Sequence, residues 1–364
     1  MKRMELGIAV VGSGRIGTLR ASMAAAHPAV SFLAVSDLDP TRALTLANQV
    51  GAQISSGDNL EVISRPEVNA VIVTTSEPEH TLPVIQALDQ GKPVLVEKPI
   101  ALTTEDADRM IAAAKRSGAE LRVGYSQRFQ KQYLLAKDQI LQGSVGKIVG
   151  GTARVYIPRS GTLQILQRAS HATPVLDLLT YYVDMLCWFM EGNPPVEVVA
   201  RGQEGVLKAA GSASNDVTWA ILSFSDGAVV SLGVCSTLPA KYPHLGLNSR
   251  IEILGTEGVM FLDVDDRNQI LYTDRGFAHW YIPKQKMDMV YLGTTAPGDW
   301  ALGDFWGPLG NETRAWLDHL STGRPCAIAT AEQARKTLEV TLSIERAAQT
   351  KETITFPLSH KGND

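Results

Sequence analysis

A glycine-rich segment near the start of the chain has the composition of a turn that binds phosphate. Gly12, Gly14 and Gly17 follow directly on the apolar run 6–11. In such a turn the first glycine permits a tight bend, the second lets the backbone approach a pyrophosphate, and the third lets the helix pack on the strand. The pyrophosphate would lie at a helix N-terminus, which attracts anions, so the spacing predicts a dinucleotide site. The predicted contacts in this segment are Gly12, Gly14, Arg15, Ile16 and Gly17.

A carboxylate follows the next predicted strand. Asp37 comes after the apolar stretch 31–36 and lies about twenty residues after Gly17, the distance at which an acid reaches the ribose of a bound dinucleotide. It would hydrogen-bond the ribose and repel a 2′-phosphate, so NAD is expected rather than NADP. Arg42 is close enough in sequence to neutralise Asp37 or to bind a phosphate, which leaves NADP as the less favoured cofactor. Flavoproteins and methyltransferases use similar turns, but strand, helix and acid in this register favour the dinucleotide.

A lysine stands at the end of another predicted strand, where the apolar run 94–96 leads into Glu97, Lys98 and Pro99. Proline biases the residue before it towards an extended conformation, which would hold Lys98 in place. Hydride transfer from an alcohol requires at least a nicotinamide cofactor and a basic group beside it, because the alkoxide that develops needs a nearby cation. The alternative for Lys98 is a solvated lysine at a strand end.

Composition limits the partners of the chain. The 364 residues include 34 Lys and Arg against 38 Asp and Glu, a net charge of −4, and no basic cluster stands out, so a nucleic acid partner is not expected. No apolar run approaches membrane-spanning length, and a cytoplasmic location is expected. Cys187, Cys235 and Cys326 are widely spaced, without a CxxC pair or a histidine at metal spacing, so we expect free thiols and no metal site.

Two patterns divide the chain, and the first extends to about residue 124. Short β-branched runs alternate there with helical stretches, such as 41–50, which is closed by Gly51. This alternation is typical of a doubly wound parallel sheet. We expect residues 1–124 to form a Rossmann domain that binds NAD(P) at the carboxyl edge of its sheet.

The second pattern begins beyond residue 146, where strand-like segments follow one another across turns such as 225–227 and 255–258. Hairpins with Asp-Gly or Gly-rich turns indicate an antiparallel sheet, which a long helix over 173–190 interrupts. We expect residues 125–364 to form an α/β domain with a large, mostly antiparallel open sheet, for substrate binding and oligomerisation. The outer face of such a sheet needs a cover, so a homodimer or homotetramer is expected.

The chain resembles the glucose–fructose oxidoreductase/inositol dehydrogenase/MocA-like oxidoreductases over nearly its whole length. The most specific motif is the segment 97–99, after a buried strand and before a capped helix, with His80 upstream and 125–129 downstream. The segment 253–258 is also typical of the family. The resemblance implies oxidation of one hydroxyl of a sugar, inositol or related polyol, or the reverse reaction, with NAD or NADP. It also implies a second domain whose open sheet often packs against another subunit.

One helix departs from the family pattern. Members commonly carry Asp-x-Gly-x-His-x-x-Asp, where this chain has Leu179 in place of the glycine and Tyr181 in place of the histidine. Glucose–fructose oxidoreductase and the dimeric dihydrodiol dehydrogenases are similar in using tyrosine there. The substitution therefore weakens an assignment as an inositol dehydrogenase more than it weakens catalysis.

Tyrosine is chemically able to replace the histidine. Asp177, Tyr181 and Asp184 are spaced i, i+4 and i+7, so their side chains share one face of a helix. A free phenol has a pKa of about 10, and work as a base near pH 7 asks for a decrease of roughly 3 units. The ammonium of Lys98 would supply much of that decrease.

The motifs and the resemblance together define the predicted site. The predicted catalytic residues are Lys98, Tyr181 and Asp177. Besides the glycine turn and Asp37, the predicted cofactor contacts are Thr74, Thr75, His80, Glu97, Lys98 and Arg128. The predicted substrate contacts are Lys98, Tyr156, Arg159, His171, Asp177 and Tyr181. For the two histidines a packing role is the alternative, since a lone histidine is weak evidence for chemistry.

Plainer alternatives also stay open for the helix and for the whole protein. Tyr181 could be a core residue beside Tyr182, and Asp177 could pair with Arg168 or Arg159. Two functions rival a dehydrogenase: a glycosidase-like enzyme that keeps NAD bound and oxidises its substrate transiently, and a non-catalytic sensor that binds dinucleotide and sugar. Lys98 and the phenol at 181 argue against the sensor.

Overall fold

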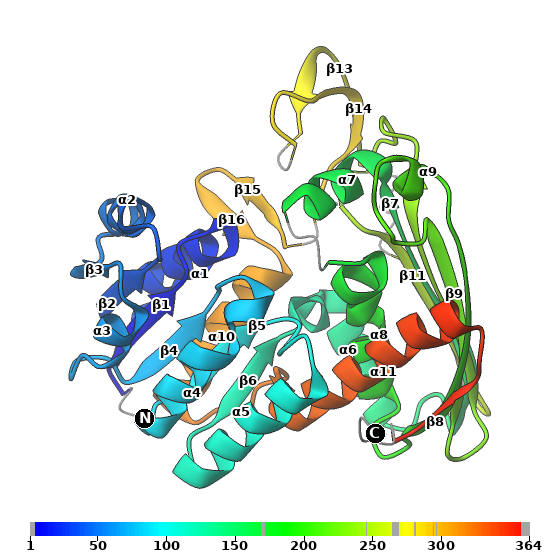
Figure 1. Cartoon of the computed structure of the whole chain (residues 1–364), viewed down its shortest axis with the longest axis horizontal. Coiled ribbons are helices and arrows are strands. Elements are labelled where there is room, and N and C mark those ends of the chain that lie inside the picture. Colours follow the sequence, from blue (N-terminus) through cyan, green and yellow to red (C-terminus); the bar gives the residue numbers. More distant parts are fainter. Residues whose placement is uncertain are drawn as a thin grey trace. The chain divides into compact units, whose positions relative to one another are not determined.

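The computed structural model describes residues 4–168, 172–244, 246–263, 269–279, 282–293, 295 and 297–357 (Figure 1). The chain divides into two compact units. The first comprises Met1–Gln130 and Trp300–Leu338, and the second comprises Lys131–Asp299 and Glu339–Asp364. Each unit is thus built from two separate stretches of chain, which is more interleaved than the expected division between residues 124 and 125.

The first unit contains a seven-stranded sheet in the order β17-β6-β5-β4-β1-β2-β3. Its strands are β1 (Leu6–Val11), β2 (Val30–Ser36), β3 (Ile54–Ser56), β4 (Ala70–Val73), β5 (Val94–Glu97), β6 (Leu121–Gly124) and β17 (Ala329–Thr330). Strands β1 to β6 are parallel, and β17 runs antiparallel to β6. The predicted doubly wound parallel sheet is confirmed. The strand order reverses between β1 and β4, and ligands of such sheets bind outside the carboxyl ends at this reversal.

Helices cover both faces of this sheet, because its central strands are apolar on both sides. Every residue of β1 and β4 is buried. The helices are α1 (Arg15–Ala26), α2 (Pro40–Val50), α3 (Asn59–Ile63), α4 (Thr81–Asp89), α5 (Thr104–Ser117) and α10 (Pro308–Thr322). α1 packs against α10 and α4 against α5, and right-handed crossovers place these two pairs on opposite faces. Asp39 caps α2 and Gly51 ends it in the left-handed conformation, so this predicted helix is confirmed.

The second unit contains a seven-stranded sheet in the order β12-β11-β7-β10-β9-β8-β18. Its strands are β7 (Ile148–Pro158), β8 (Pro195–Gln203), β9 (Val217–Phe224), β10 (Val229–Leu238), β11 (Asn248–Gly255), β12 (Val259–Asp263) and β18 (Ile354–Thr355). β7 and β10 are parallel, and the other neighbouring pairs are antiparallel. The predicted mostly antiparallel sheet is confirmed.

The main helices of the second unit lie on one face of its sheet, as α6, α8 and α11 show in Figure 1. They are α6 (Lys131–Leu141), α7 (Arg159–Arg168), α8 (Thr180–Phe189) and α11 (Ala331–Thr350), with a short α9 (Val206–Ala209) after β8. Along β9, Ala220 and Leu222 are buried, whereas Trp219 and Ile221 are 43% and 51% exposed. This alternation is expected of a sheet with one packed face and one open face.

The long helix expected over 173–190 is present in two parts. Val175–Leu179 form a π-helical turn, and α8 continues directly from it. The remaining elements are β13 (Ile270–Ala278), β14 (Lys286–Tyr291), β15 (Asp299–Ala301), β16 (Asp304–Trp306) and the 3₁₀ turns η1 (Glu77–Glu79) and η2 (Ser126–Phe129). None of the helices in the described part of the chain combines the length and apolarity needed to cross a membrane.

Candidate active site

The glycine turn between β1 and α1 has the geometry that a phosphate site requires. Gly12 has φ 98°, and a Cβ there would lie 2.7 Å from the carbonyl carbon of Thr74. A Cβ on Gly17 would lie 1.9 Å from the carbonyl oxygen of Gly12. A Cβ on Gly14, in contrast, would meet nothing within 4 Å. The chain's own packing therefore requires glycine at 12 and 17, whereas glycine at 14 keeps an open approach to the backbone.

The N-terminus of α1 suits the pyrophosphate of a dinucleotide. Gly14 is the N-cap and offers no side-chain hydrogen bond, and the first turn, which carries Arg15 and Ile16, contains no acid. An anion is the natural partner for the N–H groups of such a turn. Nearby, after β4, the buried Oγ1 of Thr75 has no hydrogen-bond partner. A buried hydroxyl in this state fits a site that a polar ligand completes.

Asp37 lies directly after β2, at the edge where the ribose is expected. Its Oδ2 accepts a hydrogen bond from the Ser13 N–H at 2.9 Å, and its Oδ1 accepts one from the Asp39 N–H at 2.9 Å. A carboxylate has about four acceptor positions, so these bonds fix Asp37 and leave capacity for a ribose hydroxyl. Arg42 forms its ion pair with Asp39 at 3.6 Å, on the surface. This geometry supports NAD over NADP.

The side chains of Thr74 and His80 form hydrogen bonds with backbone carbonyls near the proposed cofactor position. The Thr74 hydroxyl lies 3.0 Å from the Val11 carbonyl and 2.8 Å from the Gly12 carbonyl, so it clamps β4 to the glycine turn. The ring of His80 is buried, with Nδ1 3.0 Å from the Pro99 carbonyl and Nε2 3.3 Å from the Thr75 carbonyl. Burial lowers the pKa of His80, so its ring is neutral and donates one of these two bonds. The sequence did not distinguish these internal roles from contacts with a cofactor.

Lys98 is half-buried at the end of β5, next to a buried Pro99 with a cis peptide bond. The residue before it, Glu97, is held by Arg20 of α1, which the sequence analysis missed. Arg20 is fully buried, and its Nε and Nη2 donate to Oε1 of Glu97 at 2.8 and 2.7 Å. The same Nη2 donates to Oε2 of Glu312 on α10 at 2.5 Å. An arginine within a helix of small apolar residues was the signal that could have revealed this cluster.

Arg128 follows β6 in the turn η2 and is also buried. Its Nη1 donates to Oε1 of Gln333 at 3.0 Å and lies 3.5 Å from the Ala327 carbonyl. Arg128 is only 2% exposed. The structure therefore gives Arg128 a role inside the first unit, and its contact with a cofactor stays a prediction.

Asp177 and Tyr181 are both half-buried on the helix that begins with the π-helical turn, in a segment whose other residues are mostly buried. The N–H of Asp177 donates to the Thr173 carbonyl at 2.8 Å. Asp184, predicted to share their face, is only 1% exposed. π-Helical turns within helices are frequent at functional sites, because the extra residue changes which side chains face outwards. The helix thus presents Asp177 and Tyr181 together and buries Asp184.

Two other predicted substrate contacts, Tyr156 and Arg159, lie on elements of the second unit other than the Tyr181 helix. Tyr156 lies on β7, and its neighbours Val155 and Ile157 are buried towards the helices, so Tyr156 points to the open face of the sheet. The guanidinium of Arg154 stacks on its ring at 4.7 Å. Sheet alternation thus separates Tyr156 from Tyr181, which lies on the helix side. Arg159 begins α7 and donates from Nε to the Leu238 carbonyl at 3.3 Å. His171 lies outside the described residues.

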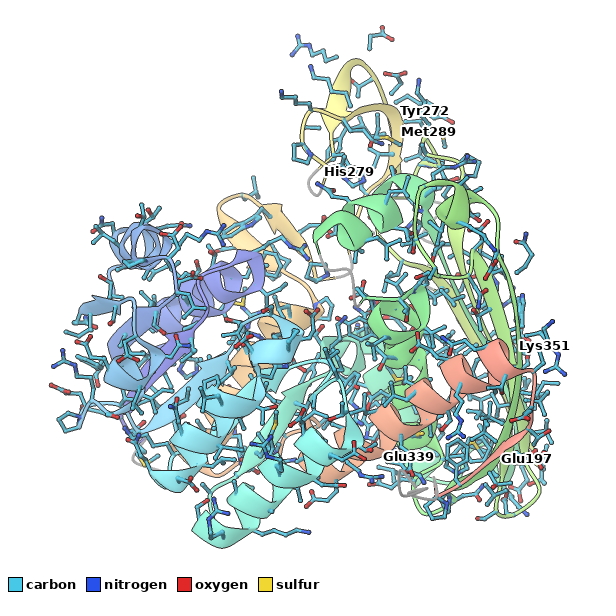
Figure 2. All side chains as sticks on the ribbon, viewed as in Figure 1. Glu197, Tyr272, His279, Met289, Glu339 and Lys351 are labelled. Atoms are coloured by element: carbon cyan, nitrogen blue, oxygen red, sulfur yellow. The ribbon has the colours of Figure 1, made fainter. Side chains whose placement is uncertain are left out.

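A cavity of about 940 Å³ lies beside the start of this helix, within the second unit. Its wall includes Thr173, Glu345 and Lys351, the last of which is labelled at the end of α11 in Figure 2. The Thr173 hydroxyl donates to Glu345, and burial raises the pKa of that carboxyl. Amide, hydroxyl and carboxyl groups alternate with apolar ones in the wall, as in a pocket for a polar small molecule.

Within the described ranges, no group of three or more His, Cys, Asp or Glu side chains is arranged to hold a metal ion. Cys187, Cys235 and Cys326 are not joined by disulfide bonds, and each is half-buried.

Two family models match the chain. Residues 6–125 match the oxidoreductase family with an NAD-binding Rossmann fold, GFO_IDH_MocA, and residues 133–261 match the GFO/IDH/MocA C-terminal domain. The first match includes the glycine turn, Asp37 and Lys98, and the second includes Asp177 and Tyr181.

Individual relatives extend over almost the whole chain. The myo-inositol 2-dehydrogenase of Thermotoga maritima is 26% identical over 354 residues, which are 95% of this chain and 97% of that protein. The 2,7-anhydro-N-acetylneuraminate hydratase of Mediterraneibacter gnavus is 25% identical over 86% of this chain and 82% of its own length. A solved structure of scyllo-inositol dehydrogenase from Lactobacillus casei, with bound NAD(H) and scyllo-inositol, has a TM-score of 0.79 at 20% identity. It covers 96% of this chain and 99% of that one, and at this identity it shows the shared fold.

Proposed function

Because this chain belongs to the GFO/IDH/MocA oxidoreductase family and is an NAD-dependent oxidoreductase of CH–OH groups, we propose that its substrate is an inositol or an inositol-like cyclic polyol. One secondary hydroxyl is oxidised to a ketone, or the ketone is reduced. The observation that carries the proposal is the similarity to a myo-inositol 2-dehydrogenase along nearly the full length of both chains.

In the proposed mechanism, Lys98, Tyr181 and Asp177 act on one substrate hydroxyl. Tyr181 takes the hydroxyl proton as the C–H hydride departs, and the ammonium of Lys98 stabilises the developing alkoxide. A cation close to the phenol would favour its ionised form, which is the form that accepts the proton. Asp177, one helical turn before Tyr181, orients substrate hydroxyls as a hydrogen-bond acceptor. Bound NAD⁺ supplies the hydride acceptor, held at the N-terminus of α1 and by Asp37.

We further propose a division of labour along the chain. Residues 1–124 bind the cofactor, and residues 125–364 bind the substrate and mediate oligomerisation. The geometry that supports the cofactor part is the turn of Gly12, Gly14 and Gly17 with the carboxylate of Asp37 fixed beside it. Arg159 and His171 are proposed as further substrate contacts, since both flank the segment that leads into the Asp177 helix.

The decisive experiment is a substrate panel. myo-Inositol, scyllo-inositol, sugars, sugar acids and dihydrodiols are each tested with NAD and NADP, and the absorbance of the reduced cofactor is followed. The panel extends beyond inositols because Tyr181 departs from the common family pattern. Reduction of NAD with at least one cyclic polyol is expected, and its absence across the panel contradicts the proposal.

A redox-neutral reaction is the second candidate function. The relative named as a hydratase is 25% identical over 86% of this chain, almost as similar as the dehydrogenase. A hydratase or an NAD-retaining glycosidase adds water or cleaves a bond with no net change in cofactor. Product analysis by mass spectrometry separates the candidates, because a mass shift of one water without accumulation of NADH supports the redox-neutral reaction.

The protein is also proposed to be a cytoplasmic homodimer or homotetramer. On the open face of the second-unit sheet, Trp219, Ile221 and Phe261 are 43%, 51% and 61% exposed. Large apolar side chains exposed on the face of a sheet favour a partner that covers them. A second copy of this chain is the proposed cover.

A further inference from the structure

A buried charge cluster lies behind Lys98 in the first unit, and we define it as Arg20, Glu97, Arg128 and Glu312. The side chains of Arg20 and Glu312 are fully buried, and that of Glu97 is 14% exposed. Arg20 bridges the two carboxylates and also donates from Nη1 to Oγ1 of Thr313 at 2.8 Å. Oε1 of Glu312 is buried without a hydrogen-bond partner. Burying an ionised oxygen without a hydrogen bond costs free energy. Glu312 is therefore the member of the cluster that is most readily neutralised by protonation.

The protonation of Glu312 sets the net charge of the cluster. Burial raises the pKa of Glu312 to about 7, against the opposing effect of Arg20. Burial acts to lower the pKa of Arg20, but Glu97 and Glu312 outweigh it and raise that pKa, so Arg20 stays charged. With Glu312 ionised, two carboxylates balance two guanidinium groups. With Glu312 protonated, the cluster carries one positive charge.

Few other charged groups face Glu312. α10 packs against α1, η2, β1 and β16, which contribute Arg20 from α1 and Arg128 from η2. β1 has no charged residue, and Asp304 of β16 is exposed. His80 is neutral at pH 7, because burial lowers its pKa. The charge of the cluster between pH 6 and 8 therefore follows Glu312.

Glu97 brings the cluster to the carboxyl edge of the sheet, since it is the last residue of β5 and its side chain is partly exposed. Arg20 holds Oε1 of Glu97 at the end of β5, beside the reversal of strand order where the ligand of such a sheet lies. The nicotinamide ring is cationic in NAD⁺ and neutral in NADH, so a charge at this end of the sheet discriminates between them. We propose that Glu312, acting through Arg20 and Glu97, is a specificity-determining residue for the oxidation state of the cofactor, and that its ionised form favours NAD⁺ over NADH. The inference rests on the proposed cofactor site.

The size of the effect follows from Coulomb's law. Two unit charges about 10 Å apart, at an effective dielectric constant of about 20, interact strongly enough to change an affinity on the order of tenfold. As the pH rises from 6 to 8, Glu312 ionises, and the ratio Kd(NAD⁺)/Kd(NADH) should fall by up to this factor. Since the adenosine half is common to both forms, its contacts cancel in the ratio.

The test measures Kd for NAD⁺ and for NADH by calorimetric titration at pH 6, 7 and 8, without substrate. The wild-type ratio is expected to fall several-fold across this range. Glu312→Gln keeps the size of the side chain and removes its charge, so its ratio should stay at the wild-type pH 6 value throughout. Thr313→Val removes a neutral contact with Arg20 and is the matched control, with the wild-type pH dependence expected. Glu312→Asp should restore part of the dependence.

Two results would overturn the inference. One is a wild-type ratio that does not change between pH 6 and 8, which needs no variant to fold. The other is a Glu312→Gln protein, folded by circular dichroism, that keeps the wild-type pH dependence. The outcome is independent of the substrate, because a chain that turns over no polyol still reports the ratio, and a polyol dehydrogenase with a constant ratio refutes Glu312 alone.

Discussion

The two units hold their candidate site residues in different ways. In the first unit, the main chain and a buried partner fix three candidate residues: Asp37 accepts two backbone hydrogen bonds, both ring nitrogens of His80 face carbonyls, and Arg20 holds Glu97. In the second unit, Asp177 and Tyr181 project from one helix. Both of these side chains are half-buried, whereas Arg20 and His80 are fully or almost fully buried. The cofactor half is therefore expected to tolerate little change, and the substrate half to carry the variation.

The largest effect is expected when one proposed catalytic residue from each unit is replaced. Lys98→Ala removes the charge that stabilises the alkoxide, and Tyr181→Phe removes one oxygen with little change in packing. Each is expected to lower kcat by about 10²–10⁴-fold, as for other acid–base groups. Steady-state kinetics with the best polyol of the panel measures this loss, and NAD titration checks that cofactor binding is retained by Tyr181→Phe.

The double variant then tests cooperation. If Lys98 and Tyr181 act as a unit, it should be little slower than the slower single variant, because such groups are strongly non-additive. Normal turnover in folded Tyr181→Phe would remove the tyrosine from the mechanism and direct attention to Asp177 or His171.

A smaller effect separates packing from binding within the glycine turn. Gly17→Ala places a Cβ 1.9 Å from a carbonyl oxygen, so unfolding free energy should fall by about 1–3 kcal/mol and NAD binding should be lost. Gly14→Ala meets no atom within 4 Å, so the protein should fold normally and yet bind NAD more weakly. Denaturant titration and NAD titration of both variants provide the measurement. Equal NAD binding in Gly14→Ala and wild type would refute the pyrophosphate position.

Cofactor choice is expected to respond to Asp37 by about tenfold. Asp37→Ser removes the acceptor for a ribose hydroxyl and the repulsion of a 2′-phosphate, so kcat/KM should fall with NAD and rise with NADP. The companion variant Asp37→Ser/Arg42→Ala asks whether Arg42 then binds the phosphate. A wild-type preference for NADP would contradict the role of Asp37.

A substitution on the open face of the second-unit sheet is expected to have the smallest effect on catalysis. Ile221→Glu introduces a charge in the proposed interface and should shift light scattering towards a 39.3 kDa species, with little change in NAD affinity. A matched control, Leu60→Glu, alters an exposed leucine on α3 in the first unit. A wild-type protein that scatters as a 39.3 kDa species at micromolar concentration would exclude the oligomer.

Local patterns in the sequence were sufficient for much of the fold and for part of the site. The alternation of apolar runs and helical stretches predicts the parallel sheet, and the Gly-rich turns predict the antiparallel one. Gly12, Asp37 and Lys98 could be placed because each directly follows a strand, and strand ends of a parallel sheet meet at one edge. The helical spacing predicts a shared face for Asp177 and Tyr181, but it did not predict that Asp177 lies in a π-helical turn.

Contacts between residues far apart in sequence were decided by the tertiary structure. Arg20 and Glu312 are 292 positions apart, and their bond arises because α10 returns to pack on α1. Tyr156 alternates with the buried Val155 and Ile157 along β7, and it faces away from the site because the helices pack on the opposite face of the sheet. The Thr74 hydroxyl forms a hydrogen bond within the fold, whereas the buried hydroxyl of Thr75 has no hydrogen-bond partner. The sequence by itself determined which chemistry the chain carries, because residue type and local spacing specify it. The tertiary structure decided which side chains are satisfied internally and which remain for ligands, because that depends on packing between distant segments.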